Sequence, residues 1–519
     1  MPTYSSKNRW AFICWITLER TSMTNMSASK THLAELDRAQ QANGSLADQV
    51  KDRWYPVFHI AAPAGWINDP NGLSHYNGRY QVFFQHHPYS TAWGPMHWGH
   101  VSSADLVTWQ REPIALAPSL DEDSGGVYSG SAVTGADGQL YVYYTGNRWE
   151  NPANRDEGNV QVQCLATSSD GLIFTKQGTV IGTTGLENFR DPKVFQLEGT
   201  WYMVLGATGQ NGRGQVRLYT SNDMVSWDFS GVLYEDPRED VFMLECPDLF
   251  ELDGKWVLMF CPERPCPVGY SNRNTHNAGY LVGDWQPGGT FVPLTDYRQV
   301  DWGHNFYAPQ TLEAPDGRRI CWGWMGSFTL PVASQAEDGW AGQLTIPRHL
   351  SLGSDLNLVS TPLEELKNLR QKETDIGPRR LEPNQRVSLL EGLDAFELEI
   401  TLDLSASSAE RIGIMVGNLA QNSYAYLGYD AQAGRVFLDR RLTVGDGGYR
   451  SAAVPVEGVL TLRIFADRGS IEVFINDGFN TISSLVFNET GSRDVALVAE
   501  SGEALIDVCK AWQLGSIWV

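Results

Sequence analysis

Residues 78–84 read GRYQVFF, and four more segments repeat this pattern of a glycine followed by a short run rich in β-branched and aromatic residues. The other four are 138–144 (GQLYVYY), 199–205 (GTWYMVL), 254–260 (GKWVLMF) and 317–322 (GRRICW). Each run is too short for a helix and follows a turn-forming glycine, so each is predicted to be a buried strand. The glycines are spaced by 60, 61, 55 and 63 residues. A period of this size in a strand-rich chain is typical of the blades of a β-propeller.

A second repeat lies between these runs. Its copies are 103–109 (SADLVTW), 169–174 (SDGLIF) and 221–227 (SNDMVSW). The short polar residues favour a turn. We expect the aromatic residue that closes each copy to pack between neighbouring blades.

A turn of related pattern precedes each glycine run. The five copies are 68–73 (NDPNGL), 128–133 (YSGSAV), 190–195 (RDPKVF), 245–250 (ECPDLF) and 307–312 (YAPQTL). The third residue of each copy lies 8, 8, 7, 7 and 8 residues before its glycine, which predicts one structural position in five successive blades. If these segments are the innermost strands, their leading side chains converge at the mouth of the central channel. Three of the leading pairs carry a carboxylate: Asp69, Asp191 and Glu245.

Composition narrows the class of partner. The 519 residues carry a net charge of −22 with a pI near 4.8, which argues against nucleic acid or an anionic membrane as the partner. The seven cysteines are odd in number, scattered and without metal-ligand spacing. They fit reduced, mostly buried thiols in a cytoplasmic protein. We expect neither a metal nor a cofactor, and the sequence does not predict the oligomeric state.

Four regions are predicted along the chain. Residues 1–52 form an N-terminal extension that is partly helical, with Leu33, Leu36 and Ala39 on the side that docks. Its apolar run 10–18 only faintly resembles a signal segment, because charged residues follow it at once and no small-residue cleavage site is present. The five-bladed propeller spans 53–355, and a linker helix, reaching to about Thr374, lies within 356–378.

The last region, 379–519, is predicted to be a β-sandwich. Apolar residues alternate with polar ones along several short segments, and an Asn-Asp-Gly sequence at 476–478 indicates a hairpin turn. No copy of the acid-bearing turn occurs there. We therefore expect an all-β chain, a five-bladed propeller followed by a mainly structural sandwich.

Several motifs resemble, in order and spacing, the invertase and β-fructofuranosidase family of glycoside hydrolases. The motifs are 66–72 (WINDPNG), 93–100 (WGPMHWGH), 128–131 (YSGS), 189–192 (FRDP), 245–248 (ECPD), 306–310 (FYAPQ) and 339–342 (GWAG). The resemblance covers about residues 53 to 519, including 462–474 (LRIFADRGSIEVF) in the sandwich, and the cytoplasmic bacterial sucrose hydrolases look most similar. It implies a five-bladed propeller joined to a β-sandwich, as the repeats predict independently.

The resemblance also implies roles for individual residues. Retaining cleavage of a glycosidic bond needs a carboxylate nucleophile and a protonated carboxylic acid. By resemblance Asp69 is the nucleophile, Glu245 the acid and then the base, and Asp191 the residue that binds fructosyl hydroxyls. Two nearby negative charges are expected to raise the pKa of Glu245, while Arg190 keeps Asp191 ionised. The implied substrate contacts are Trp66, Asn68, Gln85, Trp93, Tyr128, Ser129, Arg190, Tyr307 and Trp324.

The expected activity is the release of fructose from sucrose, with raffinose as a further substrate. Hydrolysis of sucrose 6-phosphate, hydrolysis of fructans and fructosyl transfer stay open as alternatives within the family. A non-catalytic glycan-binding propeller is the alternative from another class. It would keep the aromatic residues but lose an acid, and all three acids are present here.

Overall fold

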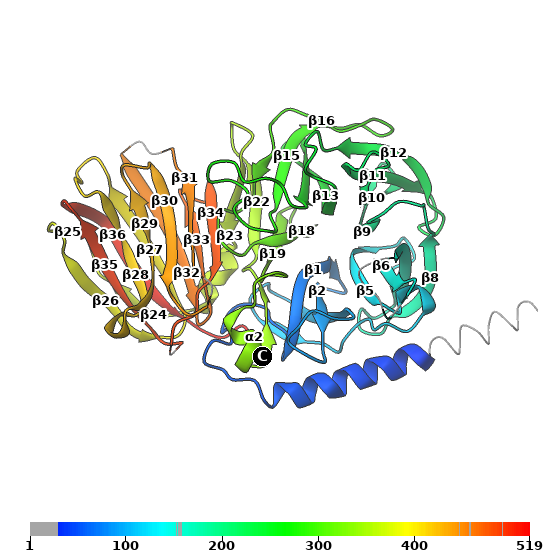
Figure 1. Cartoon of the computed structure of the whole chain (residues 1–519), viewed down its shortest axis with the longest axis horizontal. Coiled ribbons are helices and arrows are strands. Elements are labelled where there is room, and N and C mark those ends of the chain that lie inside the picture. The colour runs from blue at the N-terminus through cyan, green and yellow to red at the C-terminus, as the bar shows by residue number, and fades with distance from the viewer. Residues whose placement is uncertain (1–29, 152, 154–157, 446, 456–457, 490) are drawn as a thin grey trace, which may run out of the picture.

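Five β-sheets surround one axis, and a two-layered sandwich packs against the side of the ring they form (Figure 1). The computed structural model describes residues 30–519 except 152, 154–157, 446, 456–457 and 490. The prediction of a propeller followed by a sandwich is confirmed. Within the described residues, none of the helices is long and apolar enough to cross a membrane.

Each sheet of the ring is one blade, numbered here in chain order. Blade I comprises β1 (Gly65–Tyr76), β2 (Arg79–His87), β3 (His97–Ser103) and β4 (Trp109–Arg111), with β20 (Trp340–Ala341) added beside β1. Blade II comprises β5 (Gly126–Thr134), β6 (Leu140–Trp149), β7 (Asn159–Ser168) and β8 (Thr175–Ile181). Blade III comprises β9 (Arg190–Leu197), β10 (Thr200–Thr208), β11 (Gly214–Ser221) and β12 (Asp228–Glu235).

The last two blades complete the ring. Blade IV comprises β13 (Leu244–Leu252), β14 (Lys255–Pro262), β15 (Gly279–Asp284), β16 (Val292–Pro293) and β17 (Arg298–Gln299). Blade V comprises β18 (Tyr307–Glu313), β19 (Arg319–Met325), β21 (Gln343–Leu344), β22 (Arg348–Leu352) and β23 (Leu358–Pro362). β20 belongs to the connection between β19 and β21 of blade V, and its parallel pairing with β1 joins that connection to blade I and closes the ring.

The repeated glycines make the hairpins between the first two strands of each blade. All five have φ between 73° and 85°, a conformation that favours glycine. In three blades the preceding residue is left-handed as well, at Asn77, Glu198 and Asp253. Two consecutive residues with positive φ are typical of the tight turn that matches the twist of a hairpin. The acid-bearing turns lie on β1, β9 and β13, and the first strands of neighbouring blades contact one another around the axis.

The second repeat closes the seams between blades. Asp105, Asp170 and Asp223 each accept hydrogen bonds from backbone amides two and three residues later, which shapes the turn. The closing aromatics pack on the preceding blade: Trp109 on Trp322, Phe174 on Phe83 and Trp227 on Tyr143. All three partners lie five residues after their repeat glycines. The prediction that these aromatics pack between blades is confirmed.

The N-terminal helix spans residues 30–47 and lies along the edge of the ring (Figure 1, blue). It contacts blade I through Asn43, whose side-chain amide donates to the Ala64 carbonyl at 3.0 Å. Ala39 is buried as predicted, whereas Leu33 is 48% exposed. The prediction is wrong for Leu33, because the docked stripe runs through His32, Ala39 and Asn43 at helical spacing and turns Leu33 outward.

The linker between propeller and sandwich is less helical than predicted. A 3-10 helix covers only Glu364–Leu369, and Arg370–Asp375 then forms β24. The reason is pairing: β24 is antiparallel to β36 of the sandwich, which satisfies its backbone groups as a strand.

The sandwich consists of two sheets with a separate apolar core. One sheet contains β24, β25 (Arg379–Leu381), β27 (Phe396–Asp403), β32 (Val459–Asp467), β33 (Ser470–Ile475), β34 (Asn480–Leu485) and β36 (Ala504–Leu514). The other contains β26 (Arg386–Leu393), β28 (Arg411–Asn418), β29 (Ser423–Asp430), β30 (Arg435–Leu442), β31 (Tyr449–Ala453) and β35 (Arg493–Glu500). Ile400, Leu462 and Val473 are among the alternating residues that fill the space between the sheets.

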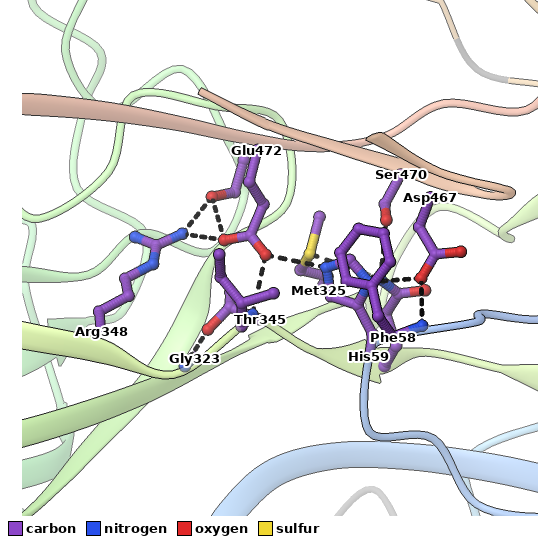
Figure 2. A network of polar contacts seen from close by, with 12 residues as sticks. Phe58, His59, Gly323, Met325, Thr345, Arg348, Asp467, Ser470 and Glu472 are labelled. Atoms are coloured by element: carbon purple, nitrogen blue, oxygen red, sulfur yellow. Dashed lines mark hydrogen bonds and ion pairs between the residues drawn. The ribbon is translucent and has the colours of Figure 1, made fainter. Parts of the chain in front are cut away.

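A buried charge network joins propeller to sandwich (Figure 2). We call His59, Asp301, Arg348, Asp467 and Glu472 the interface cluster. The His59 ring lies between the two sandwich carboxylates, 2.8 Å from Asp467 Oδ2 and 2.9 Å from Glu472 Oε1. Arg348 pairs with Glu472 and, at 3.1 Å, with Asp301. All five side chains are at most 1% exposed, so this network holds the sandwich to the propeller without contact with water.

Candidate active site

The first strands of all five blades begin at the same end of the axis, and a cavity of about 280 Å³ lies there. Its wall includes Asn68, Asp69, Gln85, Trp93, Met96, Tyr128, Ser129, Asn159, Gln161, Asn188, Arg190, Asp191, Glu245, Glu263, Tyr307 and Phe328. The leading residues of the five turns therefore converge at one mouth of the channel. This brings together three acids that are far apart in the sequence.

A β-bulge in every blade gives this wall its unusual geometry. In a regular strand successive side chains point to opposite faces, yet Asn68 and Asp69 both line the cavity, as do Arg190 and Asp191. The pairing of the first two strands shifts register at this point in all five blades. A bulge inserts an extra residue and redirects the side chains around it. Two consecutive residues per blade can thus face the axis.

These consecutive residues form two tiers around the channel. The first tier contains Asn68, Tyr128, Arg190, Glu245 and Tyr307, and the second contains the residues that follow them, Asp69, Ser129, Asp191, Cys246 and Ala308. In blades III to V the second-tier residue is left-handed, with φ of 66°, 49° and 48°. Asp191 lies in this strained region although it is not a glycine. The offset of Glu245 from the two aspartates is therefore a difference of tier.

Hydrogen bonds fix the two aspartates of the second tier. Ser129 Oγ donates to Asp69 Oδ2 at 2.6 Å, and Asn68 Nδ2 donates to Asp69 Oδ1 at 3.0 Å. The Cys246 backbone amide donates to Asp191 Oδ2 at 2.9 Å. The Cys246 thiol lies between the aspartates, 3.5 Å from Asp69 Oδ2 and 3.7 Å from Asp191 Oδ2. Burial and these two charges raise the pKa of Cys246 well above its ordinary value, so its proton stays available for donation.

The first tier holds the third acid. Arg190 Nη2 pairs with Glu245 Oε1 at 2.5 Å, and Arg190 Nε donates to the same oxygen at 3.0 Å. The Tyr307 hydroxyl donates to the other oxygen, Glu245 Oε2. Residues of three successive blades at one tier therefore meet around a single carboxyl group.

Two of the three acids have raised pKa values. Burial raises the pKa of Glu245 well above its ordinary value, and the carboxylates of Glu263 and Asp191 add to the rise, whereas Arg190 opposes it. The predicted direction for Glu245 is therefore correct, although burial is the larger cause. Burial and the charge of Asp69 also raise the pKa of Asp191, to about 6. Arg190 was expected to hold Asp191 ionised, but its guanidinium hydrogen-bonds to Glu245 instead, so its effect on Asp191 is outweighed.

Two of the predicted sugar contacts do not line the cavity. Trp66 donates from its indole nitrogen to Asn68 Oδ1 at 2.8 Å, and its ring packs on Trp324 at 5.6 Å. Both rings are at most 3% exposed. They therefore pack behind the cavity wall. Phe328 covers them on the cavity side, and its ring centroid lies 5.9 Å from that of Trp66 and 4.7 Å from that of Trp324. The other seven predicted contacts do line the cavity.

Asp248, three residues after Glu245, has a structural role. Its Oδ2 accepts hydrogen bonds from the amide and hydroxyl of Thr311 and pairs with Lys193 at 3.1 Å. It lies beyond the bulge and contributes nothing to the cavity wall.

Some wall residues were not predicted. Met96, Asn159, Gln161, Asn188, Glu263 and Phe328 lie outside the first strands, so the acid-bearing repeat could not indicate them. Glu263 is the most consequential, because it is a fourth carboxylate. It follows β14 directly, and the only sequence signal for it was an acid at the end of a strand that neighbours Glu245. We call Asp69, Asp191, Glu245 and Glu263, together with Arg190, the catalytic cluster.

Comparison with known proteins identifies the family. The N-terminal domain of glycosyl hydrolases family 32 matches residues 59–362, and the C-terminal domain of that family matches residues 365–513. The chain belongs to glycosyl hydrolase family 32. The resemblance to invertases and β-fructofuranosidases is thereby confirmed, and the protein is a glycoside hydrolase.

Relatives within family 32 match along nearly the whole chain. A sucrose-6-phosphate hydrolase of Escherichia coli is 42% identical, over 93% of this chain and 99% of its own length. A raffinose invertase of Escherichia coli is 43% identical, over 92% and 99%. The solved structure of a family 32 β-fructofuranosidase of Bombyx mori superposes with a TM-score of 0.82 at 31% identity, covering 94% of this chain and 99% of that one.

Proposed function

We propose that the protein hydrolyses terminal β-D-fructofuranosides with retention of configuration, and that sucrose is a substrate. The observation that carries the proposal is that two acids of different character lie in adjacent tiers. Asp69 is held by three hydrogen-bond donors, and Glu245 has a pKa that favours its protonated form. Asp69 accepts hydrogen bonds from Ser129, Asn68 and the Cys246 thiol, which orient it for attack. Glu245 has the raised pKa that a general acid needs.

The reaction proceeds in two displacements. Asp69 attacks the anomeric carbon of the fructosyl unit while Glu245 gives its proton to the glycosidic oxygen, and the leaving sugar departs. Glu245 is then ionised, and Arg190 and Tyr307 hold it by charge and hydrogen bond. In the second step Glu245 takes a proton from water, the water oxygen attacks the same carbon, and the bond to Asp69 breaks. Fructose leaves, and Glu245 is protonated again.

Asp191 acts on the sugar without forming a bond to it. Its second-tier position beside Asp69 places it against the fructosyl unit, where a carboxylate can accept hydrogen bonds from hydroxyl groups. Negative charge at this point also stabilises the positive character of the transition state. Asn68, Gln85 and the exposed edge of Trp93 complete the sugar contacts in this proposal.

The test is hydrolysis of sucrose, sucrose 6-phosphate, raffinose and inulin by the purified protein, with Asp69→Asn and Glu245→Gln alongside. We expect sucrose to be cleaved and kcat to fall by roughly 10²- to 10⁴-fold in Glu245→Gln. Glu251→Gln is the matched control, since Glu251 is an exposed acid of the same strand. Failure to cleave any of the four sugars would leave only a glycan-binding propeller. Full activity in either active-site variant would remove the role given to that residue.

Sucrose 6-phosphate is the second candidate substrate. It is favoured by the relatives, because proteins named as sucrose-6-phosphate hydrolase and as raffinose invertase match this chain almost equally well. The ratio of kcat/KM for the phosphorylated and free disaccharide decides between them. Inulin cleavage and the yield of fructosyl transfer products test the remaining two activities.

A cytoplasmic site of action belongs to the same proposal. It is supported by the cysteines, since the six that the structure describes are free thiols and five of them are buried. Cys14 lies outside the described residues.

A further inference from the structure

Glu263 lies beside the acid Glu245 and shares a hydrogen-bond donor with it. Glu263 follows β14, and its backbone amide donates to the Met243 carbonyl at 3.0 Å, which sets it diagonally across from Glu245 on the neighbouring strand. The Tyr307 hydroxyl donates to Glu245 Oε2 and lies 3.3 Å from Glu263 Oε1. One hydroxyl thus lies between two carboxyl groups that both border the cavity.

His276 gives Glu263 a partner of its own. The Nδ1 atom of His276 lies 3.7 Å from Glu263 Oε1, and the two residues form an antiparallel bridge through their backbones. The imidazole is held in place by rings on two sides, 5.1 Å from Tyr307 and 5.2 Å from Phe328. Glu263 is therefore paired with His276 as Glu245 is paired with Arg190.

The electrostatics of the catalytic cluster require that one acid keep a proton. Four carboxyl groups lie around the single guanidinium of Arg190, and close like charges favour protonation of one of them. Burial acts to raise the pKa of Glu263, yet its interactions with His276 and Glu245 outweigh burial and lower this pKa to about 2. The negative charge of Glu263 in turn helps to raise the pKa of Glu245. The negative charge thus stays on Glu263 and the proton on Glu245.

We propose that Glu263 is a positioning residue that keeps the catalytic proton on Glu245 until the leaving sugar takes it, and that His276 holds Glu263 for this task. The inference rests on the proposed function, in which Glu245 is the acid and then the base. Once Glu245 has lost its proton, the Tyr307 hydroxyl donates to Glu245. Once Glu245 is protonated again, that hydroxyl can turn to Glu263. The shared hydroxyl therefore follows the negative charge between two carboxylates in each cycle.

A competing role for Glu263 is direct binding of the leaving sugar, since its side chain borders the cavity. The two roles predict different kinetics. A residue that controls protonation of Glu245 changes the pH dependence and matters most for poor leaving groups. A residue that only binds the sugar changes KM at every pH.

The decisive variant is Glu263→Gln, measured as kcat/KM against pH with sucrose and with p-nitrophenyl β-D-fructofuranoside. Removing the neighbouring negative charge lowers the pKa of Glu245, so the basic limb with sucrose should move down by about one pH unit and the rate above it fall about tenfold. The aryl substrate needs little protonation of its leaving group and should lose far less. His276→Gln should shift the limb in the same direction by a smaller amount, and Glu263→Asp should restore part of the wild-type profile.

The outcomes are separable. An unmoved basic limb with a raised KM for sucrose would overturn the inference and make Glu263 a sugar ligand. Equal losses on both substrates would overturn it too. Glu251→Gln, on the surface of the same blade, should leave the profile unchanged, and circular dichroism of each variant excludes unfolding as the cause. If Glu245→Gln keeps full activity the proposed function itself fails, whereas an inactive Glu245→Gln with an unmoved limb in Glu263→Gln defeats only this inference.

Discussion

Two clusters of buried charge lie within this molecule, and they treat their acids in opposite ways. In the interface cluster three carboxylates meet two cationic side chains, Arg348 and His59, together with several backbone amides. In the catalytic cluster four carboxylates meet one guanidinium. Burial acts against ionised acids in both places. The number of cationic partners and hydrogen-bond donors available to each carboxylate decides whether its pKa rises or falls.

The pKa values follow this count. At the interface, burial acts to raise the pKa of Glu472 and of Asp467, yet Arg348 and His59 lower the first and His59 lowers the second. In the catalytic cluster the pKa values of Glu245 and Asp191 rise, whereas that of Glu263, which lies beside His276, is lowered. The interface thus has satisfied charges that bind two domains, and the active site has unsatisfied ones that are ready for proton transfer. Breaking each cluster should therefore damage different properties.

The largest effect is expected from the catalytic cluster. Asp69→Asn removes the nucleophile, so kcat for sucrose should fall by on the order of 10⁴-fold. Unfolding in urea should change little, since the amide oxygen can still accept from Asn68 and the Ser129 hydroxyl can turn to accept from the amide NH2 group. A large loss of unfolding free energy in Asp69→Asn would contradict the contrast between the catalytic cluster and the interface cluster.

Arg348→Met is the corresponding change at the interface. It leaves Asp301 and Glu472 buried without their guanidinium, which should destabilise the fold by roughly 3–5 kcal/mol. Activity per folded molecule should persist, because Arg348 does not border the cavity. Urea titration measures the loss. Arg441→Met serves as the control, since its side chain is 69% exposed and its pair with Asp439 contributes less than about 1 kcal/mol.

The pH dependence of the interface gives a smaller, signed effect. Burial acts to lower the pKa of His59, but hydrogen bonds to Asp467 and Glu472 raise it to about 9. A raised folded-state pKa contributes stability that is complete below the unfolded value of about 6.5 and is lost as pH rises through 9. The difference in unfolding free energy between wild type and His59→Gln should shrink by about 3 kcal/mol over this range. A difference that stays constant from pH 6 to 9.5 would mean that His59 is not charged.

In the active site, removing a buried titratable group should stabilise the fold, and the effect should appear over a lower pH range. The pKa of Asp191 is raised to about 6, so its ionisation costs stability as pH rises from about 4 to 6. Asp191→Asn avoids this cost and should be more stable than wild type at pH 7, by about 3 kcal/mol, while losing activity. The gain should vanish below pH 4 in thermal melts. If wild type and Asp191→Asn were equally stable at pH 7, the charge of Asp191 would be stabilised by its neighbours and its pKa would not be raised.

The sequence predicted what depends on local patterns. The repeat glycines, the Ser-x-Asp turns and the acids Asp69, Asp191 and Glu245 each occupy a fixed place in a blade, so their spacing was enough to place them. The seam contact of Trp227 with Tyr143 followed from the same register.

What the sequence did not indicate depends on contacts between blades and loops. Arg190 adjoins Asp191 in the chain but bonds to Glu245 of the next blade. Glu263 and His276 meet Glu245 only through pairing and loop packing, and no repeat marks them. Trp324 was assigned to the sugar by resemblance to the family, yet Phe328 covers it. Side-chain packing decides whether an aromatic ring faces the cavity or lies behind its wall, and the spacing of residues in the sequence does not show this.

The bulge at the start of each blade has a consequence for how such a site could be redesigned. It gives ten positions, five blades by two tiers, of which eight border the cavity, and the three acids of the proposed mechanism occupy three of these. The backbone sets the height of each position, and the residue type sets only its chemistry. Blade V, with Tyr307 and Ala308, carries no acid at either height. An engineer can therefore move a charge around the ring or between levels while the outer strands and the seams stay as they are.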